Sequence, residues 1–299
     1  MYKPSVAFYK RLIVSTLAGL VLIPSCLAAY LFFQNREMKA KLESPPLPDD
    51  LVTVSASHLE PIEPPGGRKA LSYQLLHPEF KTVFAGFDAE EPDPKTVYLS
   101  FDDGPSTGTP ALLDVLARHG VSAAFFVNGK SNRYLADQLK RISDQGHELG
   151  MHSYSHRYKI LYASMENLLD DFSRNFQFIK AETGKAPDIL RFPGGSINIF
   201  NVASYQQMIS EMLRRGFMYY DWNVSAGDTA KDASAQAITA NIVSGVRLCW
   251  GPAIVLMHDN GNPVLPQALD AAITILKAEG YVFATLKSGV RPLMFVYPD

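Results

Sequence analysis

The chain has 299 residues, with 28 basic and 30 acidic side chains and a formal net charge of −2. This balance of charge excludes nucleic-acid binding driven by bulk electrostatics, and the length allows one or two domains. The two cysteines exclude a metal site built from cysteine ligands. A disulfide framework is also excluded, because Cys26 lies inside an apolar run.

An uncharged and mostly apolar stretch, 12–33, follows a short basic N-terminus. It is long enough to cross a bilayer as a helix, so residues 1–36 are predicted to form a cytoplasmic tip and a transmembrane signal anchor. The alternative is a cleaved signal peptide, with Pro24 as the breaker and Cys26 and Ala28 before the cleavage site. Both interpretations place the remaining chain outside the cytoplasm, membrane-anchored in the first and secreted in the second.

Residues 37–94 are predicted to form a linker and an N-terminal extension of the following domain. Proline is dense within 44–69, which opposes regular helix and favours a stiff, extended spacer. Residues 70–87 are more apolar, and we interpret them as an extension that packs against the domain at an unspecified place.

Strand and helix patterns alternate from Thr96 onward, so residues 95–299 are predicted to form one α/β domain. In the first helix, Thr109 is the expected N-cap, Pro110 the first helical residue and Gly120 the C-terminal stop. Strands are expected from Thr96 to the Asp102–Asp103 pair and at 121–128, 147–151, 189–192, 217–222, 253–257 and 281–286. Helices are expected from Pro110 to Gly120 and at 134–145, 165–183, 203–214, 234–246 and 265–279. Seven such strands indicate a parallel sheet covered by helices, with a barrel favoured over an open sheet.

Unusual polar residues follow five of these strands at the point where each ends. Catalytic groups of parallel barrels lie at the C-terminal ends of the strands, so these residues are candidates for one site. They are Asp102 with Asp103, His152 with His156, Arg191, Asp221 with Trp222, and His258 with Asp259.

Two adjacent carboxylates and two histidines four residues apart form a candidate metal site. Strand side chains alternate, so Asp102 and Asp103 are expected to point in different directions, one toward a metal and the other toward an activated water. The spacing of His152 and His156 can place both imidazoles on one side of a helical turn. Two imidazoles and one carboxylate are a ligand set of catalytic zinc sites. The alternatives are an Asp-Asp-Gly-Pro turn and two unrelated loop histidines.

Arg191 ends an apolar strand, and a buried arginine needs a carboxylate partner. Asp102 is the candidate partner, and the pair would keep that carboxylate ionised. The backbone at Gly194 and Gly195 can approach a ligand closely, so its N–H groups could stabilise an oxyanion. The alternative for this segment is a plain surface turn.

His258 follows a continuous apolar strand and is a candidate general acid if a carboxylate lies beside it. Asp221 is the candidate for that carboxylate. Trp222 and Leu256 could wall a small apolar pocket next to it.

Together these motifs resemble the NodB-type polysaccharide deacetylases, carbohydrate esterase family 4. The resemblance covers about 96–286, and five motifs in order are far more specific than one. The motifs are Ser100–Gly104, His152–His156, Arg191–Gly195, Asp221–Trp222 and Leu256–His258.

The resemblance implies a deformed (β/α) barrel, a divalent metal and the removal of N-acetyl groups from glycans. Zinc is the first choice for the metal, with Co²⁺, Ni²⁺ or Mn²⁺ as alternatives. The roles carried over are metal ligands (Asp103, His152, His156), general base and its partner (Asp102, Arg191), general acid and its partner (His258, Asp221), and acetyl-methyl pocket (Trp222, Leu256).

The third motif departs from the family pattern. Phe192 replaces a commoner proline, and Gly194 replaces a commoner bulky residue, often tyrosine. The Gly194 N–H could still serve the oxyanion, but the missing side chain leaves the substrate contacts there open and suggests a wider groove.

The predicted function is removal of N-acetyl groups from a cell-surface glycan, with peptidoglycan N-acetylglucosamine as the first substrate. Deacetylation of chitin-like or other exopolysaccharides and O-acetyl hydrolysis on xylan are alternatives of the same chemistry. A catalytically inactive, anchored glycan-binding protein is the alternative of another class. The expected partners are the glycan and, through the N-terminal helix, a membrane, but no nucleic acid.

Overall fold

A computed structural model of the chain describes residues 70–129, 135–293 and 295. These residues belong to one compact unit spanning 69–299. The predicted signal anchor and proline-rich spacer lie outside the described residues. Within the described part, no helix is both long enough and apolar enough to cross a membrane.

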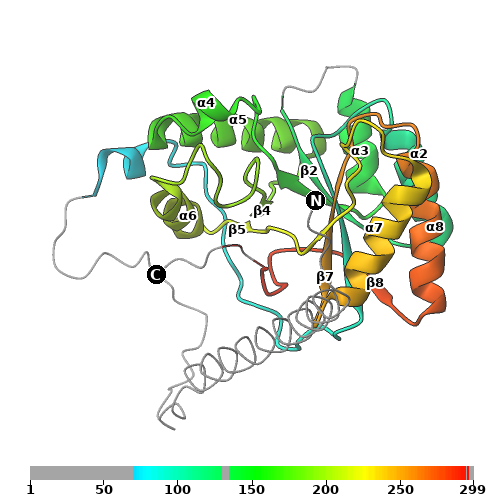
Figure 1. Ribbon diagram of the computed structural model, residues 1–299. Coiled ribbons are helices and arrows are strands. Elements are labelled where there is room, and N and C mark those ends of the chain that lie inside the picture. The colour runs from blue at the N-terminus through cyan, green and yellow to red at the C-terminus, as the bar shows by residue number, and fades with distance from the viewer. Residues whose placement is uncertain (1–69, 130–134, 294, 296–299) are drawn as a thin grey trace, which may run out of the picture. The chain divides into compact units, whose positions relative to one another are not determined.

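One parallel sheet forms the centre of the unit (Figure 1). Seven strands follow one another in the order β5-β4-β3-β2-β1-β7-β6. The eighth, β8, pairs with the first half of β1, while β2 pairs with the second half along the same edge. The strands are β1 Thr96–Asp102, β2 Ala124–Val127, β3 Glu148–Met151, β4 Ile189–Leu190, β5 Met218–Tyr219, β6 Val224–Ser225, β7 Ala253–His258 and β8 Val282–Ala284.

The prediction of about seven parallel strands with intervening helices is confirmed, but the barrel does not close. Strands β5 and β6 are the two edges of the path, and no pairing between them occurs among the described residues. The sheet is therefore a half-barrel. The sequence pattern missed β6, because Val224 lies between Asn223 and Ser225 and no apolar run marks the strand.

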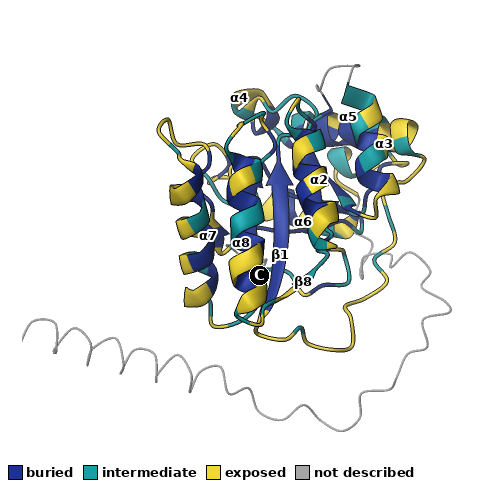
Figure 2. Cartoon of the chain, turned by 90° about the vertical axis from the view of Figure 1, so that its right-hand side faces the viewer, coloured by how far each residue is buried: buried dark blue, intermediate teal, exposed yellow. Residues whose placement is uncertain are grey.

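Helices cover the convex side of the sheet. Figure 2 shows α7, α8 and α2 side by side, each with both buried and exposed residues. Helix α8 contacts both α7 and α2, and α7 contacts strands β6 and β7. In Figure 1, α6 lies away from these three helices, and it contacts β5. The helices are the short 3-10 helix η1 Ser72–Leu75, and α2 Thr109–His119, α3 Ala136–Asp144, α4 Tyr158–Leu161, α5 Met165–Thr183, α6 Tyr205–Arg214, α7 Ala235–Leu248 and α8 Leu265–Ala278.

Local sequence signals explain most of the helix boundaries. The Ser164 side chain caps α5 by accepting a hydrogen bond from the Asn167 N–H, and Gly184 ends this helix in a left-handed conformation. The predicted cap of α2 is wrong, because Gly108 occupies the N-cap position. The Thr109 hydroxyl instead donates to Asp259 at 2.5 Å.

The alternation of side chains along β1 separates a hydrophobic core from a functional face. Val97, Leu99 and Phe101 point into the core between the sheet and the helices. Asp102 therefore lies on the opposite, concave face. The register pairs Asp102 with His258 and Ser100 with Leu256 on β7, so the same face carries polar groups from two adjacent strands.

The N-terminal extension packs into the domain core. Phe80 is fully buried, with its ring centroid 4.7 Å from that of Phe217 and 5.5 Å from that of Phe176. Buried Arg215 donates to the carbonyl oxygens of Leu76 at 2.8 Å and Phe80 at 3.0 Å. These two backbone carbonyl groups of the extension are thereby satisfied without a strand partner.

Glu148, at the start of β3 and at the opposite end from the site, makes stability depend on pH. Burial, and then the charge of Asp188, raise the pKa of Glu148 from 4.5 to about 7. Because the folded pKa is the higher one, this group reduces stability as pH rises from 4.5 through about 7. Glu148 is partly exposed, and solvent screening reduces the energy that this pKa change implies. Glu148→Gln should therefore raise the free energy of unfolding by about 2 kcal/mol at pH 8 and have little effect at pH 4.

Urea unfolding of both proteins at pH 4 and pH 8 measures this difference. The exposed Glu182→Gln is the matched control, and it should have little effect at either pH. An equal effect of Glu148→Gln at the two pH values would contradict the assignment.

Candidate active site

Three predicted ligands converge beyond the ends of β1 and β3. The Asp103 Oδ1 atom lies 3.2 Å from His156 Nε2 and 3.7 Å from His152 Nε2. One ligand atom from each of the three residues lies within 4.8 Å of the others. A carboxylate oxygen and two imidazole nitrogens fit a divalent cation of the zinc type, with positions left for water and substrate.

Unusual backbone conformations bring these ligands together. Asp103, Ser153 and His156 have φ values of 72°, 102° and 51°, in a region that costs energy for residues other than glycine. Asp102 and Asp103 consequently do not diverge as predicted, since Asp102 Oδ2 also lies 3.6 Å from His152 Nε2. The two histidines are neighbours through a loop, and the predicted helical turn is absent there.

Hydrogen bonds hold the histidine loop in place. The His152 Nδ1 atom lies 2.9 Å from the Arg191 carbonyl oxygen, which directs Nε2 toward the cluster. The Ser153 hydroxyl accepts the His156 N–H at 2.7 Å. Asp171, on α5, accepts the Tyr154 N–H at 2.6 Å. The sequence analysis missed Asp171, which lies in the middle of an amphipathic helix and carries no local signal of this role.

The protonation preferences of the cluster suit a cation. Burial raises the pKa of Asp103, but the charges of His152, His156 and His258 outweigh it and lower that pKa. Burial and then the charge of His152 lower the pKa of His156, against the opposing charges of Asp103 and Asp102. An ionised carboxylate and a neutral imidazole are the forms that bind metal.

The predicted pairing of Asp102 with Arg191 is present and fully buried. Arg191 Nη1 donates to Asp102 Oδ1 at 2.9 Å and to the Ser100 hydroxyl at 2.8 Å. The guanidinium also donates to the carbonyl oxygens of Tyr220 and Asp221, at 2.9 and 3.1 Å. Arg191 thus fixes the orientation of the Asp102 carboxylate, whose second oxygen faces the metal cluster.

The carboxylate that contacts His258 is Asp228, and the predicted pairing with Asp221 is wrong. Asp228 Oδ1 lies 3.1 Å from His258 Nδ1, and Oδ2 accepts the His258 N–H at 2.7 Å. Burial lowers the pKa of His258, but the hydrogen bond and charge of Asp228 outweigh it, so the pKa is raised. The sequence analysis missed Asp228, because it follows the unrecognised strand β6.

Asp221 instead joins two loops on the concave face. It accepts hydrogen bonds from the Ser196 N–H and hydroxyl and from the Phe295 N–H. Burial raises the pKa of Asp221 despite these bonds. Trp222 is half-buried, with its ring 4.9 Å from that of Phe295, and Leu256 lies on β7 two residues before His258.

The turn after Arg191 exposes one backbone donor. Gly194 is exposed with a φ of 79°, a conformation that favours glycine. The Gly195 N–H donates to the Phe192 carbonyl oxygen at 2.8 Å. Within the described residues the Gly194 N–H donates to no acceptor, which leaves it available to a ligand.

Asp259 holds the loop that follows the two aspartates. It accepts hydrogen bonds from the hydroxyls of Ser106 and Thr109, both at 2.5 Å. A Cβ atom at Gly104 would lie 2.5 Å from Asp259 Oδ2, so this close approach requires glycine. Asp259 is therefore a positioning residue for the loop after Asp103.

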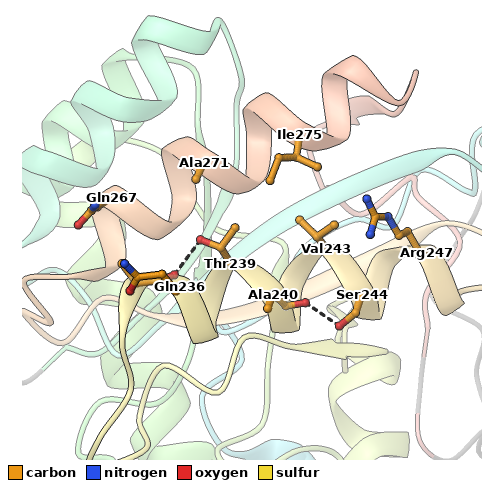
Figure 3. A pocket seen from close by; sticks show the side chains of 10 residues that line it. Gln236, Thr239, Ala240, Val243, Ser244, Arg247, Gln267, Ala271 and Ile275 are labelled. Carbon is orange, nitrogen blue, oxygen red and sulfur yellow. Dashed lines mark hydrogen bonds between the residues drawn. The ribbon is translucent and has the colours of Figure 1, made fainter.

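A surface pocket between α7 and α8 lies apart from this cluster (Figure 3). Its lining includes Thr239, Val243 and Ile275, and it contains none of the predicted site residues. This pocket is therefore separate from the site that the sequence motifs predict.

Comparison with known proteins assigns the chain to a family. A profile described as "Polysaccharide deacetylase" matches residues 89–208. The chain is also 31% identical over 208 residues to a peptidoglycan-N-acetylglucosamine deacetylase of Bacillus cereus, covering 68% of this chain and 72% of that protein. The chain belongs to the polysaccharide deacetylase family.

Solved and curated relatives agree with this assignment. The catalytic domain of a peptidoglycan N-acetylglucosamine deacetylase from Eubacterium rectale superposes with a TM-score of 0.66 at 34% identity, covering 72% of this chain and 98% of that domain. A peptidoglycan-N-acetylmuramic acid deacetylase of Bacillus subtilis is 29% identical, covering 75% of this chain and 80% of that protein. This polysaccharide deacetylase is thus a hydrolase that removes acetyl groups, as predicted.

Proposed function

We propose that this deacetylase is a metal-dependent enzyme that removes the N-acetyl group from N-acetylglucosamine residues of peptidoglycan. The observation that carries the proposal is the position of Asp102. Its free Oδ2 atom lies 3.6 Å from His152 Nε2 within the metal cluster, while Arg191 holds its other oxygen. A base held beside a candidate metal site is suited to deprotonating a water there.

Different residues around the cluster carry out the two proton transfers of amide hydrolysis. Asp102 accepts the proton of the attacking water. His258, whose raised pKa favours the protonated form, donates a proton to the leaving sugar amine, and Asp228 orients its ring. The Gly194 N–H donates a hydrogen bond to the developing oxyanion.

Asp103, His152 and His156 would hold the divalent cation, with zinc as the proposed ion. Bound there, the cation would polarise the acetamide carbonyl and activate the water. Oxygen ligands alone would favour magnesium or calcium, whereas two imidazoles favour zinc and neighbouring transition metals.

The substrate and location form the finer part of the proposal. Relatives whose names specify peptidoglycan N-acetylglucosamine support that glycan as the first choice. A membrane anchor at 12–33, followed by a proline-rich spacer, would suit an immobile substrate outside the cytoplasm. Fractionation of cells producing the full chain, with protease added outside, tests this placement.

Acetate release by the full chain in mild detergent tests the activity. The substrates are N-acetylated peptidoglycan, chitin oligosaccharides and acetylated xylan, each assayed with chelator and then with added zinc. Release from peptidoglycan that is lost with chelator and restored by zinc supports the proposal, and mass spectrometry of the muropeptides identifies the deacetylated sugar.

Other outcomes separate the alternatives. Zinc-dependent release from chitin or xylan alone would overturn the substrate and keep the chemistry. Loss of acetate from N-acetylmuramic acid would move the site of action to the other sugar of the same polymer. No release from any substrate by folded, zinc-loaded protein would favour the glycan-binding alternative.

The role of Asp228 predicts a change in the pH profile. His258 must be protonated to act as the acid, so the rate falls as pH rises through the pKa of His258. Asp228→Asn removes the negative charge that raises this pKa, and the alkaline limb of the kcat profile should move to lower pH. We expect a loss of about 100-fold at pH 8 and a smaller loss at pH 6.

The exposed Asp232→Asn is the control for loss of a carboxylate on the same loop. It should leave the profile unchanged. A profile of Asp228→Asn that is parallel to the wild-type profile at every pH would remove Asp228 from this role.

A further inference from the structure

Two aromatic rings extend outward from the candidate metal cluster. The Tyr158 ring, at the start of α4, is perpendicular to the His156 ring, with 5.3 Å between the centroids. The Phe200 ring lies 5.2 Å beyond Tyr158, tilted by 53°. We call Tyr158 and Phe200 the aromatic rim, which begins at a metal ligand and ends at the surface.

The exposed part of this rim is apolar. Phe200 is 40% exposed, and its neighbours Ile199 and Val202 are 86% and 59% exposed. Exposed apolar side chains gathered beside a catalytic site are typical of a ligand contact. Continuity with His156 argues for the ligand of this same site.

Tyr158 occupies the space above the exposed glycine of the turn. A Cβ atom at Gly194 would lie 2.9 Å from Tyr158 Cε1 and 3.4 Å from its hydroxyl. A side chain at 194 and the present position of Tyr158 therefore exclude each other. An aromatic ring from α4 thus covers the turn that carries the candidate oxyanion donor, and the groove is not simply widened there.

Hydrogen bonds make the rim rigid. The Asn198 side chain accepts the Phe200 N–H at 2.9 Å and donates to the Pro193 and Gly195 carbonyl oxygens at 3.2 and 3.3 Å. On the other side, the Tyr162 hydroxyl donates to the same Pro193 oxygen at 2.7 Å, which ties α4 to the turn. A preformed platform loses little entropy when it binds a ligand.

We propose that the aromatic rim is a glycan subsite that binds the sugar next to the residue whose acetyl group is removed. A pyranose presents C–H groups on its ring faces and hydroxyls at its edge, which suits a half-exposed aromatic surface. This inference rests on the proposed function and adds to it that Tyr158 and Phe200 bind the neighbouring sugar. No role in the chemical step is assigned to either ring.

The test compares kinetics on N-acetylglucosamine oligosaccharides of increasing length, using the full zinc-loaded protein. Phe200→Ala should raise KM for the tetrasaccharide by about 10-fold, the loss expected for one aromatic stacking contact. The value of kcat should stay within about 2-fold, because the reacting groups are unchanged. Tyr158→Phe, which keeps the ring, should change KM much less than Tyr158→Ala.

Trp250→Ala is the matched control. This tryptophan is fully exposed and precedes β7, at the opposite end of that strand from His258. It should leave KM unchanged for every length.

Failure of the proposed subsite and failure of the proposed function give different results. Acetate release with a KM that Phe200→Ala and Tyr158→Ala do not alter would overturn the subsite and leave the deacetylase. No acetate release by the wild-type protein from any glycan would overturn the proposed function itself. An equal loss for Phe200→Ala on short and long substrates would also overturn the subsite, since it would indicate a general structural defect.

Discussion

Replacing Asp102 by asparagine is expected to lower kcat for deacetylation by about 10³-fold. In the wild type, Arg191 Nη1 donates to Asp102 Oδ1 at 2.9 Å. The substitution keeps the size of the side chain and an oxygen that can accept this hydrogen bond. It removes the basic oxygen that faces the metal cluster. Acetate release under saturating substrate measures the loss, and circular dichroism and zinc content verify that the protein is folded and loaded.

Asp114→Asn provides the comparison for this result. Asp114 is an exposed residue of α2 that pairs with Arg141, and its replacement should leave kcat unchanged. Loss of a general base usually lowers the rate by about 10²-fold or more. If Asp102→Asn lowered kcat by less than about 10-fold, a different group would have to accept the proton of the water.

The second large effect concerns metal affinity. Asp103→Asn should weaken zinc binding by more than about 100-fold, because changes beyond the ligands themselves already cost 10–100-fold. Asparagine tolerates the left-handed conformation of this position, where φ is 72°, so the fold should persist. Competition with a chromophoric chelator measures the dissociation constant independently of activity.

Asp270→Asn is the control for loss of a carboxylate near a histidine. Asp270 accepts hydrogen bonds from Arg118 and His119 on the outer surface, and its removal should not affect zinc binding. Zinc affinity that is the same in Asp103→Asn and the wild type would show that these three side chains do not form the metal site.

The main strands and the site residues could be predicted because their signals are local. An apolar run that ends in a carboxylate or histidine marks a strand end, and parallel strands bring their ends to one edge. Arg191 illustrates this, since a buried guanidinium after a strand required a buried partner, and Asp102 is that partner. The alternation within β1 also separates its apolar core face from the face that carries Asp102.

Most of the predictions that were wrong or incomplete concern contacts between residues far apart in the sequence, which no short segment contains. Asp228 was missed because no apolar run marks β6, and Asp221 was the nearest carboxylate in the expected pattern. The convergence of Asp102 and Asp103 depends on a left-handed backbone at Asp103, whereas strand alternation predicts divergence. The open edge between β5 and β6 depends on pairing between distant strands, which periodicity alone does not determine.

The segment that ends at Phe295 has a practical consequence for making the protein. Two hydrogen bonds join the segment to Asp221. The Phe295 N–H donates to the Asp221 carboxylate at 2.6 Å, and the Asp221 N–H donates to the Leu293 carbonyl oxygen at 2.9 Å. The Phe295 ring also covers Trp222 and fills the space that a Cβ atom at Gly195 would need. Purification tags and immobilisation handles should therefore not be inserted at Leu293 or Phe295, because both residues bond to Asp221 and Phe295 packs against Trp222 on the catalytic face.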